Sequence, residues 1–221
     1  MTETLREGPG LAVHRLVVGP LQTNCYLAAS AGDCAVVDPG GDAPVILEAL
    51  RRLHLVPRAF LLTHAHADHT AACALLKEEY PQVPLYLHAA EASWPGHPAM
   101  SLSYWLPGGR SCPQADVLLE EGGEIAVGKA RFAVLHLPGH TPGSVGYLEE
   151  EEGVLFCGDV VFRGSVGRTD LPGSSEEDMR ASLERLCRLP GELLLLPGHG
   201  PQTTLGEEKR HNPFLAEWAG N

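Results

Sequence analysis

One stretch, Thr63-His64-Ala65-His66-Ala67-Asp68-His69, constrains this chain more than any other. It places three imidazoles and one carboxylate within six positions, directly after the apolar run 59–62. A lone histidine at a strand end is more often packed or hydrogen-bonded than a ligand, but chance rarely assembles four donors so closely. The spacing therefore predicts a metal site in a loop that follows a buried strand.

Three later apolar runs also end in a potential ligand. They span residues 130–137, 154–157 and 193–196, and they lead to His140, Asp159 and His199. Sites in sheets assemble beyond the carboxyl ends of the strands, so we expect these loops to meet at one edge. Each of these three ligands follows a glycine, which lets the backbone approach an ion closely.

Together these positions supply seven nitrogen and oxygen donors and no thiolate. That number exceeds what one tetrahedral zinc takes and suits two divalent ions sharing a carboxylate, with zinc expected first and iron or manganese as alternatives. A non-enzymatic alternative is that the ions only stabilise the fold of a binding protein. It fits this set of donors less well, because structural zinc sites are usually closed, four-coordinate and often thiolate-rich. The predicted ligands are His64, His66, Asp68, His69, His140, Asp159 and His199.

The order of elements predicts an α/β (α+β) fold. Both halves run strands first, then a helix, then a strand leading into a histidine-bearing loop, which suggests a four-layer α-β-β-α sandwich. Asp42 is expected to cap the first helix, and the acidic turn 149–153 to be a solvated hairpin tip. Expected strands are 11–18, 24–29, 34–37, 59–62, 85–87, 117–119, 124–127, 130–137, 144–148, 154–157 and 193–196; expected helices are 43–53, 70–80, one capped by Ser175 that ends at 188, and a short one after 206.

Composition limits the partners. A net charge of -12 argues against a nucleic-acid partner, which would require clustered lysine and arginine. The N-terminus has no basic stretch before an apolar core and no run is long enough to span a membrane, so we expect a cytoplasmic protein. The length of 221 residues suits one domain over 1–221. Residues 94–113, rich in proline, glycine, serine and aromatics, are expected to form one wall of a substrate cleft.

The joint pattern resembles the metallo-β-lactamase superfamily, and within it the glyoxalase II-like (hydroxyacylglutathione hydrolase-like) short bacterial hydrolases. The latter carry G-D-x-x-F-x-x-x-x-G-R-x-D, which residues 158–170 match. The motifs of the superfamily cover most of the chain: Asn24-Cys25-Tyr26-Leu27, Asp38-Pro39-Gly40, T-H-A-H-A-D-H, P-G-H-T-P-G, G-D and P-G-H-G.

The resemblance implies the αββα metallo-β-lactamase sandwich and divides the ligands between two ions. His64, His66 and His140 would hold the first ion, and Asp68, His69 and His199 the second, with Asp159 bridging them. Asp38 would either steady the histidine loop or cap the turn before the first helix. β-Lactamases of the commonest class lack a histidine at the position of His69 and have a cysteine in place of Asp159, so antibiotic hydrolysis is not expected.

The implied activity is a thioesterase that cleaves a small hydroxyacyl thioester such as S-lactoylglutathione by metal-bound hydroxide, which Asp68 and Asp159 would orient. The glutathione-binding lysine of the family corresponds to Arg168, which would contact substrate or form an internal ion pair with Asp170. Asp170 and Pro201 replace two family tyrosines. Only 22 residues follow His199, so we expect no C-terminal glutathione-binding helical domain.

A rival resemblance is to the persulfide dioxygenases, through T-H-x-H-A-D-H and G-R-T-D. Members of that family use a single iron on the equivalents of His64, His140 and Asp159. They carry Ala-His-Asp-Tyr where this chain has Gly198-His199-Gly200-Pro201.

Overall fold

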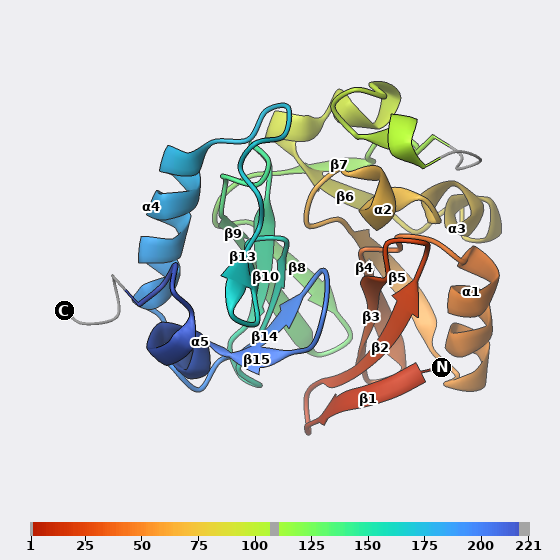
Figure 1. Ribbon diagram of the computed structural model, residues 1–221. Helices are drawn as coiled ribbons and strands as arrows, with labels where there is room; N and C mark the ends of the chain where they lie inside the picture. Colours follow the sequence, from red (N-terminus) through yellow and green to blue (C-terminus); the bar gives the residue numbers. More distant parts are fainter. Residues whose placement is uncertain (1, 107–110, 217–221) are drawn as a thin grey trace.

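Two mixed β-sheets pack face to face, and helices cover the outer face of each, as Figure 1 shows. The computed structural model describes residues 2–106 and 111–216. The predicted α-β-β-α order of layers is confirmed. No helix within the described residues is long and apolar enough to cross a membrane.

The first sheet holds seven strands in sequence order. Pairing is antiparallel from β1 to β4 and parallel from β4 to β7, because helices carry the chain back between successive parallel strands. The sequence reading missed β1. The strands are β1 (Thr2–Glu7), β2 (Ala12–Val18), β3 (Thr23–Ser30), β4 (Asp33–Val37), β5 (Val56–Leu61), β6 (Leu85–His88) and β7 (Val117–Leu119).

The first helix, α1 (Ala43–Arg52), buries Ile46 and Leu50 against this sheet. Asp42 stands at its N-cap position but does not cap it, which corrects the prediction. Its backbone is left-handed, with φ 48°, and its carboxylate accepts a hydrogen bond from the amide of Gly19 at 2.9 Å. Asp42 therefore closes the turn against the β2–β3 connection.

The helix expected at 70–80 is two helices, α2 (Ala67–Thr70) and α3 (Cys73–Glu79). The amide of Ala72 donates to the carbonyl of Pro39 at 2.9 Å, so it does not continue the α2 ladder. Contact with the turn after β4 thus breaks the helix, and α2 lies inside the predicted metal loop.

The second sheet has the order β15-β14-β11-β10-β9-β8, with only the β11–β14 pair parallel. Its outer face is covered by α4 (Glu176–Cys187) and α5 (Leu205–His211). The predicted cap is confirmed, since Ser175 Oγ accepts from the amide of Asp178. The strands are β8 (Glu124–Val127), β9 (Ala130–His136), β10 (Val145–Glu149), β11 (Val154–Gly158), β14 (Leu194–Pro197) and β15 (Thr203–Thr204), and a separate hairpin holds β12 (Val161–Phe162) and β13 (Ser165–Val166).

The core between the sheets contains fully buried aromatic side chains from both. Tyr26 of β3 packs edge-on against Phe156 of β11, with ring centroids 5.4 Å apart. The Tyr26 hydroxyl donates to the carbonyl of Pro197 at 2.6 Å. This bond joins the core to the loop that carries His199.

The acidic turn 149–153 is not simply a solvated tip, because Glu149 and Glu152 are buried. Glu152 accepts hydrogen bonds from Arg6 at 2.9 Å and from the amide of Gly10 at 2.7 Å. The prediction failed because it did not include the N-terminal hairpin of β1 and β2, which Glu152 joins to the second sheet.

Residues 94–106 lie above the edge where the sheets meet and contain two short 3-10 turns, η2 (Trp94–Gly96) and η3 (Ser103–Trp105). A further turn, η1 (Ala89–Glu91), precedes them. The carbonyl of Ser101 accepts from the amide of Ala67 at 2.7 Å, which ties the segment to the histidine loop. Residues 107–110 of the segment 94–113 lie outside the described residues.

Candidate metal centre

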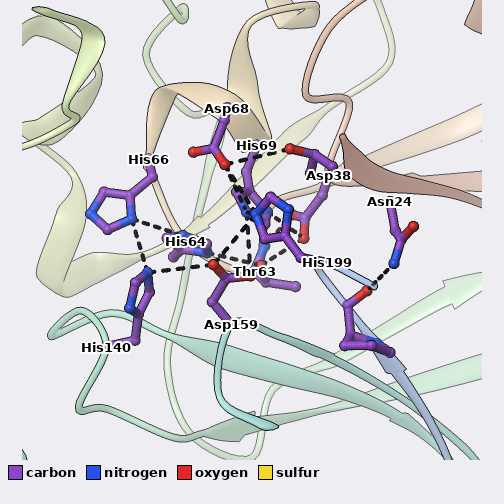
Figure 2. Close-up of polar contacts among 12 residues, drawn as sticks. Asn24, Asp38, Thr63, His64, His66, Asp68, His69, His140, Asp159 and His199 are labelled. Atoms are coloured by element: carbon purple, nitrogen blue, oxygen red, sulfur yellow. Dashed lines mark hydrogen bonds and ion pairs between the residues drawn. The ribbon is translucent and has the colours of Figure 1, made fainter. Parts of the chain in front are cut away.

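The seven predicted donors lie together at one edge of the two sheets (Figure 2). Each loop follows the carboxyl end of a strand, as expected: β5, β9, β11 and β14. The donors form three overlapping groups with ligand atoms within 4.8 Å of one another: His64, His66 and His140; Asp68, His69 and His199; and His64, His69 and Asp159.

The first group turns three ring nitrogens toward one point. His66 Nδ1 lies 3.0 Å from His64 Nε2 and 3.0 Å from His140 Nε2. A ring nitrogen makes only one hydrogen bond, so these contacts cannot both be ordinary hydrogen bonds. Nitrogens around a tetrahedral zinc would be about 3.3 Å apart, because the zinc–nitrogen distance is about 2.0–2.1 Å.

The second group has the same spacing. His199 Nε2 lies 3.1 Å from Asp68 Oδ2 and 3.3 Å from His69 Nε2. Asp68 Oδ2 and His69 Nε2 are 3.6 Å apart. Asp159 stands between the groups. One of its carboxylate oxygens is 3.4 Å from His69 Nε2, and the other is 3.7 Å from His140 Nε2 and 3.6 Å from His199 Nε2.

Asp38 organises the histidine loop through hydrogen bonds. One carboxylate oxygen accepts from the Thr63 amide at 2.8 Å, and the other accepts from Thr63 Oγ1 at 2.7 Å and contacts His69 Nδ1 at 3.0 Å. Thr63 Oγ1 in turn lies 3.1 Å from His64 Nδ1. Asp38 thereby assigns the proton to Nδ1 of both rings and leaves their Nε2 lone pairs facing the centre.

His140 is oriented in the same way by a backbone group, since its Nδ1 lies 2.9 Å from the carbonyl of Arg168. His66 is the exception. Its Nδ1 faces the centre, and its Nε2 is buried with no hydrogen-bond partner within the described residues. The His66 ring packs instead beside Trp94, with centroids 6.0 Å apart.

Several supporting residues were not predicted. Glu91 is fully buried, and its carboxylate accepts from the amides of Ala65 at 2.6 Å and Gly143 at 2.8 Å, which joins two ligand loops. Asn24 fixes a third loop by donating to the carbonyls of Pro197 and Gly200. Position 24 was recognised only as part of a family motif, and Glu91 carried no sequence signal.

Close packing at Gly198 supports the predicted need for glycine beside the ligands. A Cβ at this position would stand 2.2 Å from Asp159 Oδ1 and 2.5 Å from His69 Cε1. Both are ligand side chains that cannot move away without leaving the centre, so any other residue would displace one of them.

The electrostatics of the centre favour a bound cation. Burial lowers the pKa of His66 to about 3, and that of His64 is also lowered, by burial and by the neighbouring His69, so both rings are neutral. Burial alone would raise the pKa of Asp159, but His69 and other histidines hold it well below its usual range. His64 and His66 are thus neutral beside an ionised Asp159, which are the protonation states that ligands require. Burial alone would lower the pKa of His69, but Asp159 and the other nearby carboxylates raise it, so His69 carries a proton that a bound ion would displace.

The residues fit a pair of metal ions on structural grounds alone. Asp159 Oδ1 is buried with no hydrogen-bond partner among the described residues, which would be costly without a cation. The ion pairs that the described part of the chain forms with Asp68 and Asp159 involve histidines, and neither carboxylate pairs there with lysine or arginine. The chemistry of the donors suits zinc, iron or manganese.

A cleft of about 350 Å³ opens onto the centre. His66, Asp68, His140 and Asp159 lie at its base. Arg168 also lines it, but its guanidinium donates two hydrogen bonds to Asp170, at 2.6 and 2.9 Å. Of the two roles expected for Arg168, substrate contact or an ion pair with Asp170, the ion pair is the one that the structure contains.

Comparisons with known proteins agree with this geometry. A family model described as "Metallo-beta-lactamase superfamily" matches residues 18–199. The probable metallo-hydrolase YqgX of Bacillus subtilis is 40% identical over 91% of this chain and 96% of its own length. The hydroxyacylglutathione hydrolase GloC of Haemophilus influenzae is 35% identical, covering 90% of this chain and 95% of the relative.

Two solved structures extend the comparison. BLEG-1 B3 metallo-beta-lactamase is 41% identical, with a TM-score of 0.86, over 92% of this chain and 99% of that chain. TTHA1623, solved in a di-iron-bound form, is 42% identical with a TM-score of 0.84, over 91% of this chain and 99% of that chain.

Proposed function

This chain belongs to the metallo-beta-lactamase superfamily, and we propose that it is a dinuclear metal-dependent thioesterase acting on hydroxyacyl thioesters such as S-lactoylglutathione. The observation that carries the proposal is the pair of donor groups with Asp159 between them, beside an open cleft. The identity with GloC, a hydroxyacylglutathione hydrolase, supports the substrate class, and the di-iron form of TTHA1623 supports two ions.

His64, His66 and His140 would hold one ion and Asp68, His69 and His199 the other, with Asp159 placed between the two groups. When bound, the two ions lower the pKa of a coordinated water and polarise the carbonyl of the substrate. Asp68 and Asp159 border the cleft, where their carboxylates orient the attacking water. Asp38 and the carbonyl of Arg168 keep the imidazole rings in position.

The reaction adds water to the thioester carbonyl carbon and breaks the carbon–sulfur bond. The products are a carboxylate, a thiol and one proton. Because a thiolate leaves readily, the reaction does not require a dedicated general acid. This accounts for a cleft base made of histidines and carboxylates that are already committed to the metal centre.

The test is turnover of S-lactoylglutathione by protein loaded with zinc, iron or manganese, together with its metal content. We expect His66→Ala and Asp159→Ala to lose both metal uptake and turnover, because each removes one of the donors of the centre. His97→Ala is the matched control, since His97 is exposed and lies outside the donor groups. An unchanged rate in either ligand variant would refute the assignment.

A second candidate, β-lactam hydrolysis, is favoured by one observation, the 41% identity with BLEG-1 B3 metallo-beta-lactamase. A chromogenic cephalosporin assayed beside the thioester decides between them. Oxygen uptake with glutathione persulfide tests the mononuclear iron dioxygenase. Both families carry T-H-x-H-A-D-H, which supplies Asp68 and His69, so this assay rather than the second donor group separates the dioxygenase from the dinuclear hydrolase.

A further inference from the structure

We propose that the cleft selects thioesters whose leaving thiol is apolar and uncharged, and that Trp105 determines this selectivity. The inference rests on the proposed function and specifies its substrate class. It follows from the side chains that line the cleft, from their exposure to water and from the charge at its mouth.

The cleft walls above the metal centre are apolar. Leu102, Trp105 and Leu106 form one wall, and Leu21 and Leu171 complete the lining from two other loops. Leu21 belongs to the β2–β3 connection and Leu171 precedes α4, so three separate segments place apolar side chains around one opening. Water-exposed apolar groups gathered in this way mark binding grooves.

These apolar side chains are exposed to water. Trp105 is 80% exposed and Leu21 is 55% exposed, although both line the cleft. Leu102 is held in the left-handed region, with φ 57°, which is unusual for a bulky residue. Such strain clusters at ligand-binding sites, and here it fixes the residue that begins the apolar wall.

The charge of the cleft disfavours glutathione as the leaving group. Glutathione carries two carboxylates, which require cationic partners. Arg168 is the one lysine or arginine among the described residues that line the cleft, and both of its paired hydrogen bonds go to Asp170. That pair is neutral, so the part of the cleft mouth formed by the described residues matches an uncharged group better than an anion.

The experiment keeps the acyl group constant and varies the thiol. KM is measured for S-lactoylglutathione and for the lactoyl thioester of benzyl mercaptan, with wild-type, Trp105→Ala and Tyr104→Ala protein. Tyr104 is the matched control because it is equally exposed, at 80%, and adjacent in sequence, but does not line the cleft. Non-hydrolysable thioether analogues of both substrates give Kd values independently of turnover.

We expect the KM and Kd for the benzyl compounds to be about tenfold lower than for the glutathione compounds, which corresponds to about 1.4 kcal/mol. Trp105→Ala should remove this preference by raising KM and Kd for the benzyl compounds, while Tyr104→Ala should keep both the preference and the wild-type kcat. Equal or better use of S-lactoylglutathione, or a preference that survives Trp105→Ala, would overturn the inference while leaving the thioesterase intact. Failure to cleave either thioester would instead overturn the proposed function.

Discussion

At the scale of single residues, Asp38 links the two halves of the donor set. Its carboxylate contacts His69 directly and reaches His64 through the hydroxyl of Thr63. His64 belongs to the first donor group and His69 to the second, so one buried carboxylate sets the orientation of rings in both. The sequence left two roles open for Asp38, steadying the histidine loop or capping the turn before the first helix, and its side-chain contacts are with the histidine loop.

Replacing Asp38 by alanine should therefore weaken the whole metal centre. The variant leaves His69 Nδ1 and the amide of Thr63 without their acceptor, and groups that orient metal ligands typically contribute about 10–100-fold in affinity. We predict a loss of metal affinity of this size, measured by competition with a chelator, and a loss of about 1–3 kcal/mol in the free energy of unfolding.

Asp42→Ala is the control for this prediction. Asp42 lies in the same turn and has the same φ of 48°, but it is exposed and its carboxylate contacts only the backbone of Gly19 among the described residues. A similar loss of metal affinity in both variants would mean that the turn, rather than the Asp38 carboxylate, supports the centre.

At the scale of elements, the long buried strands were predictable, but β1 and the break between α2 and α3 were not. Apolar runs that lead to glycine and a ligand marked β9, β11 and β14 correctly. β11 and β14 are buried on both faces, which leaves a continuous apolar stretch, whereas β9 buries alternate residues. The break between α2 and α3 depends on a hydrogen bond from Ala72 to Pro39. A contact over that sequence distance leaves no periodic signal, so the local pattern was read as one helix.

Glu152 shows the same limit and yields a test. The hydrogen bond from Arg6 lowers the pKa of the Glu152 carboxyl, so its stabilising contribution is present above the unfolded pKa of about 4.3 and is lost as the pH falls through the lower folded value. Glu152→Gln should cost about 1 kcal/mol of unfolding free energy at pH 7, and the difference from wild type should disappear in acid.

Urea denaturation across this pH range measures the effect of Glu152→Gln. Glu151→Gln, in the same turn but exposed, should leave stability unchanged at every pH. If Glu152→Gln still lowers the unfolding free energy in acid, then the shape of the Glu152 side chain, rather than its charge, joins the hairpin to the N-terminal strands.

At the scale of the whole molecule, the seven donors were predictable as a set, but the buried residues that hold their loops in place were not. Four loops at the carboxyl ends of strands meet at one edge because the two sheets pack face to face there. Glu91 and Asn24 hold three of those loops through hydrogen bonds to backbone groups. Each is a single buried polar residue, and no sequence motif indicates that it makes these bonds. Their role follows only from which backbone groups the fold brings to them.

The central claim is that the described edge holds two ions which share Asp159. The most direct measurement is anomalous diffraction from crystals of the metal-loaded protein. We predict two peaks, one contacted by His64, His66 and His140, the other by Asp68, His69 and His199, with Asp159 touching both. A single peak at full loading, or two peaks without Asp159 between them, would contradict the account.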